Sequence, residues 1–111
     1  MSNKIKMTFA VPGTLKTELQ QRVIKDGYGL RGKSKWVSEA IRSLFEYKSH
    51  IDLINYSDEI NGLDKMETVV LDYDLKQMLE SKIVDVRKEY PSLEGVKSKI
   101  LRTSILQRFI R

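Results

Sequence analysis

Residues 4–12 read Lys-Ile-Lys-Met-Thr-Phe-Ala-Val-Pro, and the larger apolar side chains fall on every second position. Successive side chains of a β-strand point to opposite faces, so this period of two predicts a strand with one buried face. Pro12 lacks a backbone N–H and should end the strand. We expect the buried residues to be Met7, Phe9 and Val11, and the exposed residues to be Lys6, Thr8 and Ala10.

Two helices should follow this strand. Thr14 is a residue that can cap a helix, and Leu15, Leu19 and Val23 then form one apolar stripe at helical spacing. Gly27 and Gly29 should end that helix, because glycine tolerates the left-handed backbone that often follows a helix. Ser34 is then the predicted N-cap of the second helix.

The same order of elements is written a second time. Residues 8–24 match residues 68–84 at a shift of 60, and Lys33-Ser34-Lys35 matches Lys97-Ser98-Lys99 at a shift of 64. The second copy therefore carries four extra residues in an internal loop. It predicts a strand near residues 68–73, a helix from 74 to about 89, and a helix from Ser98 onward.

The repeat also decides the register of the second strand, where Val69 and Val70 are adjacent and either could point inward. The alignment with the first strand places Val69, Leu71 and Tyr73 inside. The exposed residues are then Met66, Thr68 and Val70. The opposite choice would expose Glu67 on the same face.

Length and composition limit the architecture. With 111 residues, neither half would bury enough apolar surface to be stable alone, so the halves should share one core. We expect a mainly helical fold with a two-stranded antiparallel ribbon, made of a first unit (1–47), an acidic connector (48–64) and a second unit (65–111) that form one compact domain. The chain has no cysteine, which excludes disulfides and thiolate metal sites. No segment resembles a membrane span or a signal-peptide core, so a cytoplasmic setting without a membrane is expected.

Charge is unevenly distributed. Residues 1–50 hold ten Lys and Arg against four Asp and Glu, residues 51–64 hold none against four, and residues 65–111 hold ten against seven. Two basic units thus flank an acidic segment, and the sequence pI is about 9.5. Basic residues gathered at a strand and at two helix starts are typical of nucleic-acid binding.

These features resemble the ribbon-helix-helix (Arc/MetJ-type) family of DNA-binding proteins. The resemblance rests on residues 6–12, on the glycine-bearing turn and on Gly32-Lys33-Ser34-Lys35, and it extends to the second unit. In that family two protomers pair their strands into a ribbon that enters the major groove. Two units in one chain are similar to the tandem pseudo-dimers of TraY-type relaxosome accessory proteins in plasmid conjugation.

The alternation and the helix starts predict the DNA contacts. A lysine can donate to guanine O6 or N7, and a threonine can bond a base or touch a thymine methyl group. The residues predicted to read bases are Lys6, Thr8, Ala10, Met66, Thr68 and Val70. Helix N-termini and flanking lysines attract phosphate. The residues predicted to hold phosphates are Lys4, Lys33, Ser34, Lys35, Lys97, Ser98 and Lys99. Because the two strands differ, the preferred DNA need not be palindromic.

Alternatives remain open at this stage. Ser34 and Ser98 would cap helices in any protein, and Lys6 and Thr8 would suit a solvated strand face. The expected function is sequence-specific binding of double-stranded DNA by a transcriptional repressor. Its alternatives are a relaxosome accessory protein with a relaxase partner, and an antitoxin-like protein-binding module; self-association on adjacent DNA sites is compatible with the first two. No nucleophile–base pair, phosphate loop or metal cluster is visible, so neither enzyme activity nor a cofactor is expected.

Overall fold

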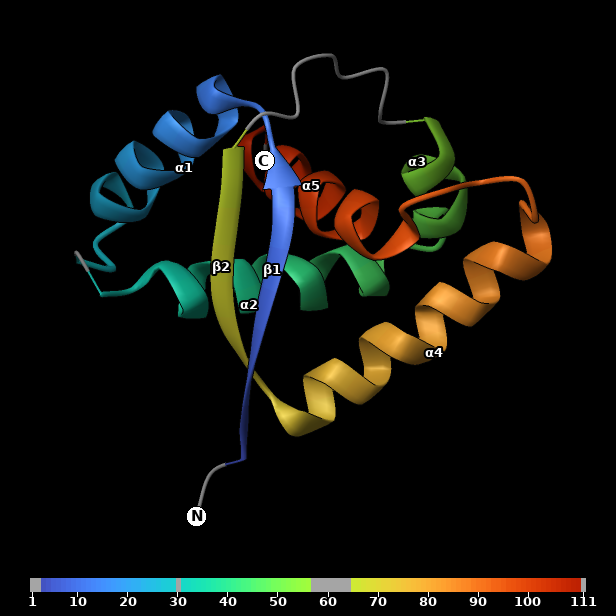
Figure 1. Cartoon of the computed structure of the whole chain (residues 1–111). Coiled ribbons are helices and arrows are strands. Elements are labelled where there is room, and N and C mark those ends of the chain that lie inside the picture. Colours follow the sequence, from blue (N-terminus) through green and yellow to red (C-terminus); the bar gives the residue numbers. More distant parts are fainter. Residues whose placement is uncertain (1–2, 30, 57–64, 111) are drawn as a thin grey trace.

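The computed structural model describes residues 3–29, 31–56 and 65–110, which form five helices and two strands (Figure 1). The prediction of a mainly helical fold with a two-stranded antiparallel sheet is confirmed. The elements in chain order are β1 (Lys4–Val11), α1 (Gly13–Lys25), α2 (Lys33–Glu46), α3 (His50–Tyr56), β2 (Lys65–Asp72), α4 (Tyr73–Glu89) and α5 (Val96–Phe109).

The two strands pair antiparallel along their whole length. Thr8 lies opposite Thr68, and a hydrogen bond of 3.0 Å joins their hydroxyl oxygens. The neighbouring outward pairs are Lys6 with Val70 on one side and Ala10 with Met66 on the other, each two positions away along the strands. Because the 60-residue repeat maps Thr8 onto Thr68, the register is symmetric about this central pair.

One face of the ribbon is buried, as the alternation predicts. Phe9 and Val11 of β1 are fully buried, and so are Val69 and Leu71 of β2. The inward register predicted for Val69 is therefore confirmed. The expectation for Tyr73 was wrong: its side chain is about half exposed (48%), because β2 ends at Asp72 and Tyr73 is already the first residue of α4.

The helices cover the buried face of the ribbon. In Figure 1, α2 crosses behind the two strands, while α1 and α4 lie on opposite sides of them. Helices α2 and α5 pack against each other beneath the ribbon. Burial of one large apolar side chain stabilises the fold by about 1.5–3 kcal/mol. The fully buried residues of these two helices are Trp36, Val37, Ala40, Ile41, Leu44, Ile100, Leu101, Ser104 and Ile105.

The start of each helix differs from the capping prediction. Pro12 is the N-cap of α1, so Thr14 is a helical residue rather than a cap. Ser34 and Ser98 likewise lie within the first turns of α2 and α5, whose N-caps are the glycines Gly32 and Gly95. The Ser34 hydroxyl instead accepts a hydrogen bond of 2.9 Å from the Val70 backbone N–H, a contact between distant segments that local patterns cannot reveal.

The predicted end of the first helix is confirmed. Helix α1 ends at Lys25, and Gly27 and Gly29 have φ angles of 84° and 75°. The Gly27 N–H donates to the Ile24 carbonyl, and the Tyr28 N–H donates to the Val23 carbonyl. This pair of bonds satisfies two of the carbonyl groups that a helix leaves free at its C-terminus.

The first part of the connector forms a helix of its own. Helix α2 stops at Glu46, and α3 is a separate short helix. Ile54 is fully buried, and Ile51 and Leu53 pack partly against the core, so α3 is part of the same hydrophobic core. The rest of the connector, including Ile60, lies outside the described residues.

We predict that the two faces of β2 differ sharply in their contribution to stability. Leu71→Ala should lower the free energy of unfolding by about 2–5 kcal/mol, because it removes a fully buried side chain. Met66→Ala, which truncates a side chain that is 55% exposed on the opposite face of the same strand, should change it by less than about 0.5 kcal/mol. Urea unfolding measures both values. Equal losses in the two variants would contradict the register.

Candidate nucleic-acid interface

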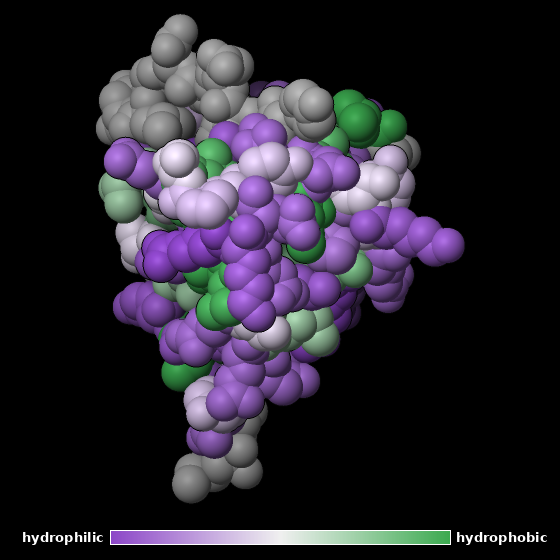
Figure 2. Space-filling model, turned by 90° about the vertical axis from the view of Figure 1, so that its right-hand side faces the viewer, coloured by the Kyte–Doolittle hydropathy of each residue, from purple (hydrophilic) through white to green (hydrophobic). Residues whose placement is uncertain are grey.

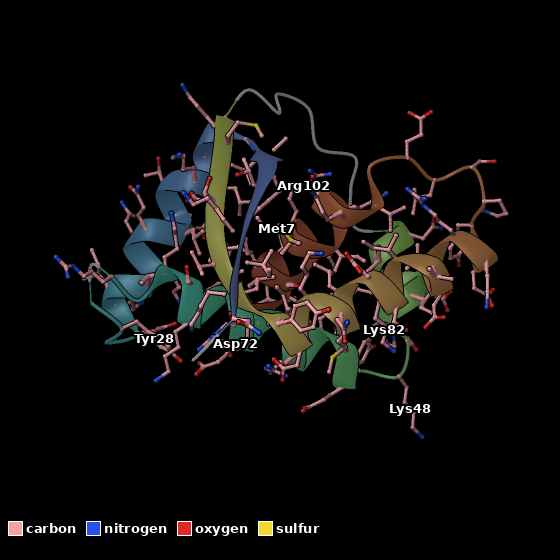
Figure 3. The ribbon with its side chains drawn as sticks, turned by 60° about the horizontal axis from the view of Figure 1, so that its bottom comes forward. Met7, Tyr28, Lys48, Asp72, Lys82 and Arg102 are labelled. Atoms are coloured by element: carbon pink, nitrogen blue, oxygen red, sulfur yellow. The ribbon has the colours of Figure 1, made fainter. Side chains whose placement is uncertain are left out.

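All six residues predicted to read bases lie on the outward face of the ribbon. Three cross-strand pairs succeed one another along it: Lys6 with Val70, Thr8 with Thr68, and Ala10 with Met66. Lys6, Thr8 and Met66 are exposed, and the other three residues are partly exposed. Figure 3 shows the ribbon lying over the helices, with Met7 on its inner side. The alternation of the two strands thus brings the predicted residues together.

An ion pair between a lysine and an aspartate lies at one end of this face. The Lys4 ammonium lies 3.1 Å from a carboxylate oxygen of Asp72, its cross-strand neighbour, and both side chains are about half exposed. Exposed ion pairs contribute only about 0–1 kcal/mol. Lys4 can therefore exchange this partner for another anion at little cost.

The start of α2 is anchored to β2. The Lys33 ammonium forms an ion pair with Glu67, whose side chain is only 2% exposed on the inner face of the strand. A buried carboxylate without a partner would strongly destabilise the fold, so Lys33 is needed where it is. Ser34 accepts the Val70 N–H beside it. Of the predicted phosphate-binding residues of α2, Lys35 alone is exposed; its ammonium lies 6.0 Å from the centre of the Tyr28 ring.

The start of α5 is arranged differently. Lys97 is exposed, and Ser98 is partly buried. Lys99 is buried, contrary to the expected surface position, and its ammonium donates to the Asn55 carbonyl of α3 at 3.3 Å. The next turn of α5 contacts β1, where the Arg102 guanidinium donates to the Ala10 carbonyl at 2.9 Å (Figure 3).

Two hydrogen bonds, here called the anchors, each join a helix of one half of the chain to the strand of the other half. Helix α2 belongs to the first half and binds β2 through Ser34 and Val70. Helix α5 belongs to the second half and binds β1 through Arg102 and Ala10. Ala10 and Val70 are equivalent positions at the shift of 60 residues. Each strand is therefore held at its outer edge by a helix from the other half.

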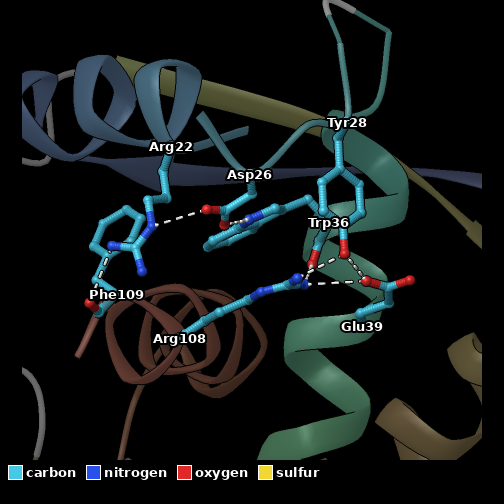
Figure 4. Close-up of polar contacts among 7 residues, drawn as sticks. All are labelled: Arg22, Asp26, Tyr28, Trp36, Glu39, Arg108 and Phe109. Atoms are coloured by element: carbon cyan, nitrogen blue, oxygen red, sulfur yellow. Dashed lines mark hydrogen bonds and ion pairs between the residues drawn. The ribbon is translucent and has the colours of Figure 1, made fainter. Parts of the chain in front are cut away.

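A cluster of charged and aromatic side chains ties the end of α5 to the turn between α1 and α2 (Figure 4). The Arg108 guanidinium lies 4.5 Å from the centre of the Trp36 ring and donates to the Trp36 carbonyl and the Tyr28 hydroxyl, each at 2.7 Å. Arg108 replaces the apolar residue found at Leu44 in the first copy. This mismatch in the repeat was the available signal for the cluster, but no local pattern indicates the partners of Arg108.

Asp26 is the acidic member of the same cluster. The indole N–H of Trp36 donates to its carboxylate at 2.8 Å, and the Arg22 guanidinium lies 3.4 Å away. The Trp36 hydrogen bond, followed by the positive charges of Arg22 and Arg108, lowers the pKa of Asp26 below its ordinary value, although desolvation acts in the opposite direction. Trp36 itself is fully buried in the core.

The flank of the molecule that carries α4 offers no comparable arrangement. Figure 2 shows this side as mainly hydrophilic, with hydrophobic residues in separated patches. Met78 and Val84 are exposed apolar residues of α4. Single exposed apolar residues are normal on protein surfaces and indicate no site.

No family model, curated protein or solved structure matches this chain. The resemblance to ribbon-helix-helix proteins accordingly stays a prediction from the residues. Within the described residues, no group of three or more His, Cys, Asp or Glu side chains could hold a metal ion. None of the described helices is both long and apolar enough to cross a membrane.

We predict that Asp26 makes stability depend on pH in the acid range. Because its pKa is lower in the folded than in the unfolded state, its stabilisation is complete above the unfolded value of 3.8 and is lost as the pH falls through the folded value. Asp26→Asn should therefore lose less stability than the wild type between about pH 5 and about pH 2.5. Urea midpoints across this range measure the difference. An unchanged pH dependence in the variant would show that the carboxylate plays no such part.

Proposed function

We propose that this chain binds double-stranded DNA sequence-specifically by laying the β1–β2 ribbon in the major groove, and that it acts as a transcriptional repressor. The observation that carries this proposal is the outward face of the ribbon. Its side chains can donate hydrogen bonds or touch methyl groups, and these are the two kinds of contact by which bases are read in the major groove. A two-stranded ribbon has the dimensions that this groove admits.

The charge of the molecule supports an anionic partner. The formal net charge is +5 at pH 7, and Lys6 stands on the outward face without an ion-pair partner among the described residues. The acid on that face, Asp72, is neutralised by Lys4. The net positive charge would therefore attract DNA phosphates, and on the ribbon itself the unpaired cation lies at the Lys6 end.

Phosphate contacts are proposed for the exposed members of the predicted set. Lys4, Lys35 and Lys97 are accessible beside the ribbon or at the starts of α2 and α5, where backbone N–H groups add partial positive charge. Lys33, Ser34 and Lys99 are engaged inside the protein. Under this proposal those three residues fix the helix starts relative to the ribbon, and the exposed lysines contact the phosphate backbone of the DNA.

We further propose that the two halves form a pseudo-dimer within one chain. The symmetric register about Thr8 and Thr68 supports this arrangement. So does the exchange of anchors, in which a helix of each half holds the strand of the other. One chain would then supply the complete ribbon for which a ribbon-helix-helix protein ordinarily needs two.

The anchors also favour DNA over a partner protein that adds a strand to the ribbon. Strand addition requires free backbone groups at the edge of a sheet. The Val70 N–H is bonded to Ser34, and the Ala10 carbonyl is bonded to Arg102. A third strand would have to break these contacts, whereas a nucleic acid approaching the outward face would leave them intact.

We predict distinct effects for a base-reading and a phosphate-binding lysine. Lys6→Ala should reduce discrimination between a selected site and random DNA by about 5- to 150-fold, since a good base contact contributes about 1–3 kcal/mol. Lys97→Ala should weaken binding to all sequences alike and make the salt dependence shallower by about 0.9 in log–log slope. Fluorescence anisotropy between about 50 and 200 mM salt measures both quantities.

Lys88→Ala, in the last turn of α4, is the matched control, because it removes the same charge far from the ribbon (Figure 1). It should leave discrimination unchanged and alter the slope less than Lys97→Ala does. If Lys6→Ala keeps full discrimination between the site and random DNA, the ribbon does not read the groove. Derepression of a reporter gene that carries the selected site, on expression of Lys6→Ala in place of the wild type, tests the repressor role.

A further inference from the structure

The two ends of the ribbon's outward face carry different kinds of side chain, because of the way the strands pair. Lys6 lies opposite Val70 at one end, and Ala10 lies opposite Met66 at the other. The first end therefore carries a cation beside a branched apolar side chain, and the second end carries only apolar side chains. Thr8 and Thr68 separate the two ends at the centre.

Neighbouring charges do not remove this difference. Lys4, beyond Lys6, is paired with Asp72. At the other end, the Lys16 ammonium donates to the Met66 carbonyl at 2.6 Å and the Arg102 guanidinium donates to the Ala10 carbonyl at 2.9 Å. Both groups keep their charge, but these bonds hold them at backbone carbonyls rather than among the outward side chains. Lys65 lies opposite Val11 in the register, so the alternation directs its side chain away from the outward face. Lys6 thus supplies the unpaired ammonium group of this face within the described residues.

We infer that the ribbon reads an asymmetric DNA site in a fixed direction, with a guanine at the Lys6–Val70 end and thymines at the Ala10–Met66 end. This inference rests on the proposed function and specifies which bases each end recognises. An ammonium group donates to guanine O6 and N7, whereas the side chains of alanine and methionine have no strong donor and match the C5-methyl group of thymine.

Met66 is the residue that sets the direction. At the shift of 60 residues it occupies the position of Lys6, so the two ends would be nearly alike if it were a lysine. Its side chain is 55% exposed and would become buried against base edges in the groove. The flexible thioether chain adapts to irregular apolar surfaces, which suits contact with methyl groups.

The central pair cannot set a direction. The hydroxyl groups of Thr8 and Thr68 are bonded to each other and are equivalent in the repeat, so they present the same chemistry to either orientation of the DNA. Ala10 lies four positions after Lys6, which corresponds to about 13 Å of strand. The guanine and the thymines should therefore lie roughly four base pairs apart.

The decisive variant is Met66→Lys in the full-length chain. Sites are first selected from a random DNA pool with the wild type, and then with the variant. The wild type should select an asymmetric site, and Met66→Lys should select a site with guanine in both halves, approaching a palindrome. Met78→Lys, which adds the same charge at an exposed methionine of α4, is the matched control and should keep the asymmetric preference.

Modified bases test the individual contacts. Replacing thymine by uracil removes only the methyl group; at the Met66 end it should weaken binding of the wild type by about fourfold, the effect of one buried methyl-sized group, and should have a smaller effect on Met66→Ala. Replacing guanine by 7-deazaguanine at the other end should weaken binding of the wild type and leave Lys6→Ala unaffected. Circular dichroism verifies that each variant is folded.

The outcomes separate this inference from the proposal beneath it. If no sequence is enriched by the wild type, both fail. If the wild type enriches a palindrome, or if Met66→Lys keeps the asymmetric preference, the protein reads DNA but the assigned direction is wrong. Loss of affinity on uracil substitution that is equal in the wild type and in Met66→Ala also overturns the assignment of the thymine contact.

Discussion

The pairing of β1 with β2 is the constraint on which the rest of the structure depends. A ribbon of two strands has too little contact to be stable in water alone, so its apolar face must be covered by helices. Its strands come from segments 60 residues apart, and their union brings both halves of the chain around one core. The inner face carries Phe9, Val11, Val69 and Leu71, all fully buried. The same alternation leaves the other face to solvent, so the need to bury one side of the ribbon creates the exposed side.

Two polar anchors then fix how the helices lie against the ribbon. Burial against apolar side chains is not directional, and it would allow a helix to slide or rotate beneath the strands. The bond from the Val70 N–H to Ser34 and the bond from Arg102 to the Ala10 carbonyl are directional, and each joins a helix to the strand of the other half. The ion pair between Lys33 and the buried Glu67 adds a third contact at the start of α2. The positions of both helix starts relative to the outward face are consequently set by hydrogen bonds and charge.

The parts of this arrangement that could be predicted from the sequence are those that depend on neighbouring residues. The alternation around Phe9 and the glycine turn after α1 are local and were predicted correctly. The register of Val69 was ambiguous locally and was predicted correctly from the alignment with the first strand. The N-cap assignments of Ser34 and Ser98 failed because a serine before a helical pattern looks the same whether its hydroxyl caps the helix or, as in Ser34, binds a distant strand. The contacts of Arg108 could not be predicted for the same reason, because its partners Tyr28 and Trp36 lie more than 70 residues away in the sequence. The outward placement of the six residues on the candidate interface followed from the strands, whereas the burial of Lys99 depended on α3, which the acidic connector did not reveal.

Positions at which the two halves differ show which substitutions are possible in a single chain but not in a dimer of identical subunits. In a dimer of identical subunits every substitution occurs twice, so a glutamate at the position of Glu67 would place two carboxylates in the core, each needing its own cation. Here Glu67 takes the place of Met7 in one half only, and a single carboxylate is paired with a single lysine, Lys33. Arg108 likewise replaces the equivalent of Leu44 once, where Tyr28 and Trp36 of the other half can receive it. The difference between Lys6 and Met66 on the outward face belongs to the same pattern. When two halves share one chain, a residue in one half can be substituted without changing its equivalent in the other. The side chains of the proposed recognition surface can therefore differ between the two ends, while the pairing of the two strands stays symmetric.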